Sequence, residues 1–242
     1  MLPFRLNMGL EERRGLGRAD GLETIMSMPF ARYGVRELIV GSALLTLAFL
    51  ASLWIFVWLA PVFLALLGLV VWFFRDPERR VPDEANILLA PADGRVVEIS
   101  QVDEPDFIGG PAVKIGIFLS IFDVHLNRAP CRGQVAYLRY QPGQFKNALR
   151  QAAARLNESN SIGIEADGRF GRVLVKQIAG AIARRIVCEC KLDDVLEAGQ
   201  KFGMIKLGSR TEVYFPAASE VRLRVKVGDK VLAGETILGA AK

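Results

Sequence analysis

Histidine and cysteine are scarce in this chain, which limits the sites that it can build. Its 242 residues include a single histidine, His125, and three cysteines, Cys131, Cys188 and Cys190. The Cys-Glu-Cys spacing is not that of a zinc knuckle, and no second pair is present to complete one. We therefore expect reduced cysteines and no metal site.

Charge is missing from one long stretch, because residues 38–74 contain no Asp, Glu, Lys, Arg or His. The run is longer than the roughly 15 apolar residues of a signal peptide, so we expect a retained membrane segment. It approaches the length of two spans of about 20 residues each, and Pro61 lies where a hairpin would turn. The expected legs are 38–59 and 62–74, and a single long tilted span is the alternative.

Basic residues flank this run on both sides: Arg32 and Arg36 before it, and Arg75, Arg79 and Arg80 after it. The positive-inside tendency then places both flanks, and the rest of the chain, on the cytoplasmic side of the cell membrane. The net charge of +5 has a near partner in anionic lipid headgroups. We therefore expect no nucleic-acid partner.

The remaining chain divides into segments of different composition. Residues 1–37 lack periodicity and indicate a mobile or membrane-surface leader. Residues 75–86 carry the prolines and charges typical of a linker. Residues 87–242 consist of short β-type runs broken by glycine, with helical spacing only at 144–157. The expected fold is mainly β, in the α+β class: a compact sandwich of barrel-sandwich-hybrid type behind an N-terminal membrane hairpin.

Gly208 and Ser209 stand between two apolar, strand-like runs. The pair is compatible with a plain turn, and it is also compatible with a specific reaction. In a strained backbone the Ser209 hydroxyl can attack the Gly208 carbonyl, since glycine has no Cβ to hinder it. Elimination of the resulting ester and hydrolysis of the dehydroalanine would leave a pyruvoyl group at a new N-terminus.

Five separated motifs accompany this pair. FFRDPER, PADGRVVEI, FLSIFDVHLNRAP, IAGAIARRIVC and FGMIKLGSR occur in this order between residues 73 and 216. With them the chain resembles the short bacterial and archaeal branch of the phosphatidylserine decarboxylase family. The resemblance implies a proenzyme that cleaves itself between Gly208 and Ser209. Its products would be a beta chain, 1–208, and an alpha chain, 209–242, with the pyruvoyl group made from Ser209.

The same resemblance implies the reaction. The amine of phosphatidylserine would form a Schiff base with the pyruvoyl carbonyl, lose CO₂ and leave as phosphatidylethanolamine. Neither pyridoxal phosphate nor a metal would be required. The implied partners are the membrane lipid and the two cleavage fragments, joined as a heterodimer, and a homo-oligomer is left open.

A lone histidine is commonly a hydrogen-bonded structural residue, although histidine titrates nearest neutral pH and therefore suits proton transfer. The resemblance implies that His125 is the proton donor. Asp93 matches an aspartate that the family uses near its histidine, where a carboxylate would orient the ring. Before a glycine it could equally be a turn residue. Longer members carry a second histidine, assigned to self-cleavage, where this chain has Arg128. The variant His125→Ala tests whether cleavage and decarboxylation share this residue. Loss of both reactions would indicate a shared residue, and cleavage without decarboxylation would indicate separate ones.

Four further residues are candidates for binding the lipid phosphodiester or carboxylate, namely Arg128, Asn160, Arg184 and Arg185. Each is equally compatible with a solvated strand face or a turn. The family usually has Asn-Glu-Arg-Asn where this chain has Asn-Glu-Ser-Asn at 157–160. A role tied to that arginine therefore does not transfer to this chain.

Two alternatives remain open. In the first, the chain is a decarboxylase of another serine-headed lipid, such as archaetidylserine. In the second, the chain is a non-enzymatic, membrane-anchored adaptor. The adaptor hypothesis rests on residues 225–239, which resemble the hairpin of lipoyl and biotinyl domains without their modified lysine. It gives no reason for the Gly-Ser pair, and the coiled-coil heptads usual in such adaptors are missing from the sequence.

Overall fold

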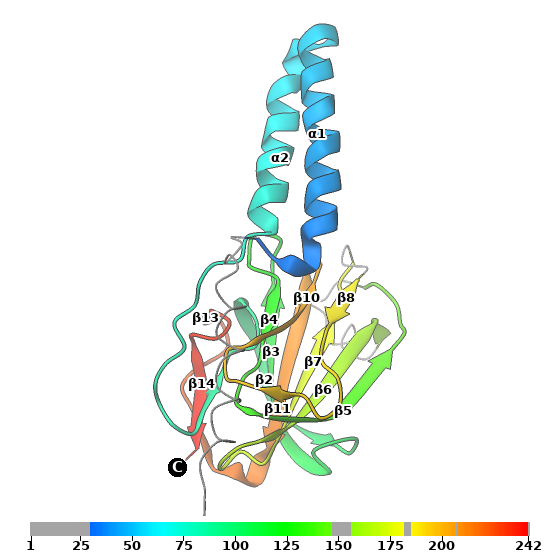
Figure 1. The fold of residues 1–242 in the computed structure, drawn as a ribbon. Helices are drawn as coiled ribbons and strands as arrows, with labels where there is room; N and C mark the ends of the chain where they lie inside the picture. Colours follow the sequence, from blue (N-terminus) through cyan, green and yellow to red (C-terminus); the bar gives the residue numbers. More distant parts are fainter. Residues whose placement is uncertain (1–29, 147–155, 182–184, 207, 242) are drawn as a thin grey trace, which may run out of the picture.

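The computed structural model describes residues 30–146, 156–181, 185–206 and 208–241. Two helices project from a β-rich body, and the C-terminus lies on that body, far from the tip of the helices (Figure 1). The expected leader up to residue 29 and the middle of the expected helix at 144–157 lie outside the described residues. The mainly β, α+β class predicted from the sequence is confirmed.

The N-terminal part is a helical hairpin. A short turn, η1 (Arg32–Gly34), leads into α1 (Val35–Ile55), and η2 (Val57–Leu59) leads into α2 (Ala60–Phe73). The two helices lie side by side along their length (Figure 1). Together with η1, α1 is long and apolar enough to cross a membrane by length and composition, whereas α2 is shorter.

The turn of this hairpin lies earlier than the sequence predicts. The chain leaves helical geometry at Phe56, and Pro61 sits inside the first turn of α2 instead of at the bend. Proline suits a first helical turn because the N–H that it lacks would have no partner there. Trp54 and Trp58 near the bend are 94% and 88% exposed. Such an exposed apolar surface requires a covering phase, for which a lipid bilayer is suited.

The runs expected to be strands are strands, because alternating side chains suit a sheet with one buried face. The structure describes β1 (Ile87–Leu89), β2 (Gly94–Glu104), β3 (Gly110–Leu119), β4 (Leu126–Arg128), β5 (Gly133–Gln141), β6 (Ser159–Ala166), β7 (Arg172–Ile178), β8 (Ile186–Cys188), β9 (Val195–Leu196), β10 (Lys201–Ile205), β11 (Ser209–Pro216), β12 (Val221–Leu223), β13 (Lys230–Val231) and β14 (Ile237–Ala241), with one more turn, η3 (Ala217–Ser219).

These strands form three antiparallel sheets. The largest has the order β13-β2-β3-β11-β7-β6-β5-β9, and the two smaller sheets have the orders β1-β14-β12 and β4-β10-β8. The strand β11 lies near the middle of the large sheet, between β3 and β7. The strand β10, which precedes it in sequence, is the centre of the β4-β10-β8 sheet. The chain therefore changes sheet between residues 205 and 209.

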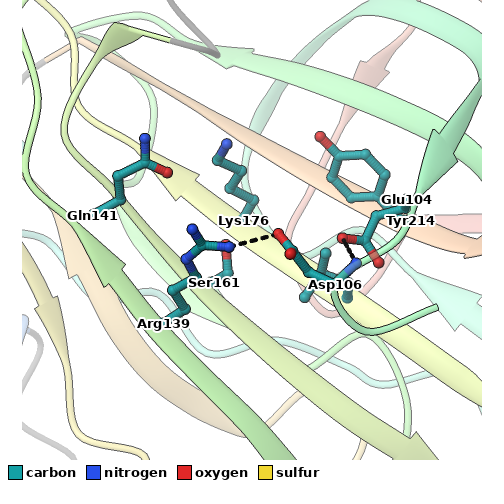
Figure 2. Close-up of a pocket in the computed structure, with 8 residues that line it drawn as sticks. Glu104, Asp106, Arg139, Gln141, Ser161, Lys176 and Tyr214 are labelled. Carbon is teal, nitrogen blue, oxygen red and sulfur yellow. Dashed lines mark hydrogen bonds and ion pairs between the residues drawn. The ribbon is translucent and has the colours of Figure 1, made fainter. Parts of the chain in front are cut away.

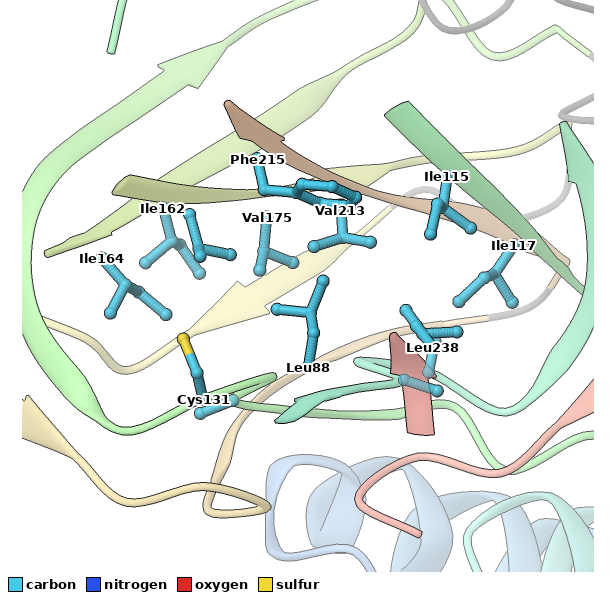
Figure 3. Packing of buried hydrophobic residues seen from close by; sticks show 14 of the residues in the cluster. Leu88, Ile115, Ile117, Cys131, Ile162, Ile164, Val175, Val213, Phe215 and Leu238 are labelled. Carbon is cyan, nitrogen blue, oxygen red and sulfur yellow. The ribbon is translucent and has the colours of Figure 1, made fainter. Parts of the chain in front are cut away.

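The core lies between the inner face of the large sheet and the smaller sheets. Figure 3 shows Leu88 and Leu238, from β1 and β14, facing Val175 and Val213 from the large sheet. All four side chains are fully buried. Burying one such side chain contributes about 1.5–3 kcal/mol, so this core holds β11 firmly in its register.

Candidate active site

The Gly208-Ser209 pair occupies the change of sheet between β10 and β11. Gly208 has φ +61°, in the left-handed region that only glycine adopts at little cost. Ser209 begins β11, pairs with Leu119 of β3 and is fully buried. Its Oγ is the one buried side-chain oxygen or nitrogen of the described residues without a hydrogen-bond partner. Such an atom carries an energetic cost, which is typical of a reacting group.

The fold brings His125 to this pair. His125 immediately precedes β4, and β4 pairs with β10 through Leu126 and Met204. The Ile205 N–H donates to the His125 carbonyl at 3.2 Å, and the Gly208 N–H donates to His125 Nε2, also at 3.2 Å. The only histidine of the chain therefore contacts the residue before Ser209, and its role as a proton donor stays a prediction.

The His125 ring is held in one tautomer. Its Nδ1 lies 2.9 Å from the Asp123 carbonyl, which only accepts, so Nδ1 carries the proton and the lone pair of Nε2 accepts the Gly208 N–H. Burial lowers the pKa of His125 to about 4, an effect that the Asp123 carbonyl opposes in part. The ring is therefore neutral at physiological pH, and Nε2 is a base.

The base of the helical hairpin forms a wall of this site. The ring of Phe73, the last residue of α2, lies 4.4 Å from the His125 ring, centroid to centroid. Phe73 belongs to a buried apolar cluster with Ala31, Tyr33, Phe74, Val124, Leu126 and Met204. This cluster joins the hairpin to β4 and β10, and it keeps water from the histidine.

Asp93 lies just before β2 and is buried, but its carboxylate does not orient the histidine ring. Arg79 donates to Oδ2 at 2.7 Å and the Ala233 N–H donates to Oδ1 at 2.8 Å. Burial raises the pKa of Asp93, and these two donors oppose the rise. Asp93 thus fastens the linker to the segment between β13 and β14, and its catalytic role stays a prediction.

Arg128 is also engaged away from the reacting pair. Its guanidinium donates to the carbonyls of Gly199 and Pro77 and forms an ion pair with Asp76 at 3.5 Å. It alternates with Asn127 along β4 and so projects to the other side of the strand. Arg128 therefore anchors the linker after α2.

The remaining candidates divide between surface and core. The Arg185 side chain is 69% exposed and lies 3.9 Å from Glu37, while Arg184 lies outside the described residues. Asn160 on β6 is buried, and its Nδ2 donates to Gln177 Oε1 at 3.1 Å. The roles of all three in lipid binding stay predictions.

Asn160 belongs to a buried polar network that the sequence did not reveal. Gln177 on β7 donates to Asn127 Oδ1 at 2.8 Å, and Asn127 donates to Thr211 Oγ1 at 3.1 Å. Thr211 is two residues after Ser209, and therefore on the same face of β11. One signal in the sequence points to Asn127 and Thr211. Each lies two residues after His125 or Ser209, and residues two apart on a strand share one face.

A polar pocket of about 80 Å³ lies on the opposite face of the large sheet (Figure 2). Tyr214 of β11 lines it, and Tyr214 alternates with the inward-facing Val213. Within it Arg139 donates to Asp106 at 2.7 Å. Because Ser209 faces inward, this pocket is separate from the reacting pair. Its lining residues are Glu104, Asp106, Arg139, Gln141, Ser161, Leu174, Lys176 and Tyr214.

Comparison with known proteins identifies the family of this site. The family model described as phosphatidylserine decarboxylase matches residues 66–239. The chain belongs to the phosphatidylserine decarboxylase family. The match includes Gly208, Ser209 and His125, so the site built above lies inside the part shared by the family. Membership in an enzyme family also shows that the adaptor hypothesis is wrong.

Curated relatives extend the match over most of the chain. A relative from Rhodopirellula baltica is 46% identical over 213 residues, covering 87% of this chain and 88% of its own length. One from Symbiobacterium thermophilum is 49% identical over 199 residues, covering 81% and 90%. One from Desulfotalea psychrophila is 43% identical over 212 residues, covering 88% and 96%. Each is named phosphatidylserine decarboxylase proenzyme.

Proposed function

We propose that this chain is a self-cleaving, pyruvoyl-dependent decarboxylase that converts phosphatidylserine to phosphatidylethanolamine and CO₂. The observation that carries the proposal is the buried Ser209 Oγ without a hydrogen-bond partner, next to Gly208 in a left-handed conformation. The family and the names of its relatives support the substrate. They favour phosphatidylserine over archaetidylserine, which remains the second candidate.

Self-cleavage needs only groups of this chain and one water. The Ser209 Oγ attacks the Gly208 carbonyl carbon, and the bond from that carbon to the Ser209 nitrogen breaks as the ester forms. A base then removes the Cα proton of residue 209, and Gly208 leaves as a carboxylate. Water hydrolyses the remaining enamine, ammonia departs, and a ketone is left at position 209. Apart from its two neighbours in the chain, no heavy atom lies within 4 Å of the position that a Cβ of Gly208 would take, so no more distant residue crowds that side of Gly208.

The ketone supplies the chemistry that protein side chains lack, a carbonyl that takes up the lipid amine and accepts the electrons released with CO₂. His125 provides the proton that replaces the carboxyl group, through Nε2, since Nδ1 is committed to the Asp123 carbonyl. The apolar cluster around Phe73 excludes water from this step.

Cleavage itself changes the acidity of His125. Before cleavage Nε2 accepts the Gly208 N–H and the ring is neutral. Cleavage places a new carboxylate on Gly208, the residue whose N–H donates to His125 Nε2. A nearby negative charge favours the imidazolium form. The same ring thus serves as a base in the precursor and becomes a proton donor in the mature enzyme.

We place the helical hairpin in the cell membrane, with the β-rich body on the cytoplasmic side. The apolar helix α1 and the arginines at both ends of the hairpin support this orientation. A fluorescent protein that folds only in the cytoplasm, fused after Lys242, should fluoresce in membrane fractions. The orientation would be contradicted if this fusion did not fluoresce and if alkaline phosphatase, which is active only in the periplasm, were active when fused at the same point.

Intact mass under denaturing conditions tests the function. The wild-type chain should give two species. The larger should end at Gly208, and the smaller should begin at residue 209 with a pyruvoyl group in place of serine. The Ser209→Ala variant should remain one chain and show no decarboxylation. Ser219→Ala is the matched control, because Ser219 only donates to the Pro216 carbonyl. A single unbroken wild-type chain with full activity would refute the proposal.

A further inference from the structure

The two flanks of the Gly208-Ser209 bond are held in different ways. Downstream, Ser209 enters the ladder between β11 and β3 at once. Upstream, β10 ends at Ile205, and the hydrogen bond from the Lys206 N–H to the Arg185 carbonyl is 3.2 Å long. The side chain of Lys206 adds a further attachment, because its Nζ lies 2.8 Å from Glu37 Oε1.

This ion pair is unusual for the burial of its lysine and for its position. The Lys206 side chain is only 12% exposed, although lysine ammonium groups are strongly hydrated and normally reach solvent, whereas the Glu37 side chain is 39% exposed. Glu37 lies in the first turn of α1, so the pair joins the cleavage segment to the helical hairpin. Arg185 also approaches Glu37, but at 3.9 Å and with a mostly exposed side chain. Exposed pairs of that kind contribute little.

Holding the upstream flank matters for the reaction. A left-handed residue next to a buried nucleophile persists only when the chain on both sides is fixed. A displacement of about 1 Å between reacting atoms can slow a reaction by about a hundredfold. If Lys206 were free to move, Gly208 could relax away from Ser209 while β11 stayed in its ladder.

We propose that Glu37 and Lys206 are positioning residues for self-cleavage, acting as a clamp between the hairpin and the upstream flank of the bond that breaks. The inference rests on the proposed cleavage between Gly208 and Ser209. It assigns the hairpin a second task besides reaching the membrane, since its first turn helps to set the geometry of the precursor.

The test is a time course of cleavage after cell-free synthesis of the full chain with vesicles of phosphatidylcholine and phosphatidylglycerol. Glu37→Gln and Lys206→Gln should each lengthen the half-time of cleavage about tenfold, which corresponds to about 1.4 kcal/mol in the barrier. Exchanging the charges, with Glu37→Lys and Lys206→Glu together, should restore most of the rate. Glu84→Gln is the matched control, because it breaks the exposed pair with Arg224.

A second readout separates positioning from a general loss of stability. Decarboxylation per pyruvoyl group in the fully processed Glu37→Gln enzyme should stay within twofold of wild type, and its denaturation midpoint should match that of Glu84→Gln. Wild-type half-times in the single variants, or no recovery after charge exchange, would overturn the clamp while leaving the proposed function intact. Failure of the wild-type chain to cleave between Gly208 and Ser209 would instead refute the proposed function.

Discussion

At the residue scale, the main feature is a buried histidine with a fixed proton. The Asp123 carbonyl selects the tautomer of His125, and burial lowers the pKa of the ring from its ordinary value of 6.5 to about 4. An unfolded chain would bind a proton there at a higher pH than the folded chain does. His125 therefore makes the stability of the precursor depend on pH.

The sign of this dependence follows from the two pKa values. Between about pH 6.5 and about pH 4 the unfolded state binds the extra proton, so acidification favours unfolding in this window. We expect the uncleaved Ser209→Ala precursor to lose about 2 kcal/mol between pH 7 and pH 5 through this group. Denaturant titrations at both pH values, repeated with His125→Ala added, measure the difference. Equal losses in the two proteins would contradict it.

Individual residues were predictable from the sequence where their chemistry is rare. Ser209 and His125 follow from a Gly-Ser pair in a family setting and from a single histidine. Asn127 and Thr211 were missed, since buried amides and hydroxyls are common and their pairing depends on which strands meet. The bond from the Asp123 carbonyl was equally hidden, because a backbone group leaves no mark in a sequence.

At the element scale, the two faces of β11 carry different kinds of residue. Its inner face begins with Ser209, whereas Arg210 projects to the outer face and lies over Gly116 of β3, leaving no room there for a Cβ. The Arg210 side chain is only 1% exposed and pairs with Glu212 at 2.8 Å and with Glu98. A buried ion network thus lies directly behind the reacting serine.

Breaking this network should be costly. Arg210→Met leaves Glu212 buried without its arginine partner, and loss of one member of a buried pair costs about 3–5 kcal/mol. Arg224→Met removes a partner from the exposed Glu84 pair and should lower the stability far less, because solvent screens an exposed pair. Denaturant midpoints of the two variants, each in the Ser209→Ala background, provide the comparison. Similar midpoints would show that the buried network contributes little.

The elements themselves were largely predictable, because alternation along a strand is a local property. The bend of the hairpin was not, because proline marks a helix start as well as a turn, and Pro61 does the former. The order of the strands in the sheets could not be predicted from the sequence either. It depends on contacts between segments far apart, such as β10 with β4 and β8.

At the scale of the whole molecule, the proposed alpha chain cannot leave after cleavage. It would contain β11, β12, β13 and β14, and all of these except β12 pair with strands of the beta chain. The strand β11 is also enclosed on both sides, by β3 and β7. Removing it would open the middle of the large sheet and expose the core.

We therefore expect the two fragments to copurify through an affinity tag placed on either one. They should separate only in denaturant, because the ladder hydrogen bonds and buried side chains act together. Size-exclusion chromatography in detergent followed by intact mass measures this directly. Elution of a free alpha chain from a native column would contradict the expectation.

The contact between the hairpin base and the cleavage segment also bears on the timing of activation. A reactive ketone formed in an unanchored chain would meet soluble amines long before it met a lipid. Because Phe73 packs against His125 and Glu37 pairs with Lys206, we expect the proposed cleavage to be fastest once the hairpin has folded onto the β-rich body. Assembly of the membrane anchor would then precede most of the irreversible cleavage.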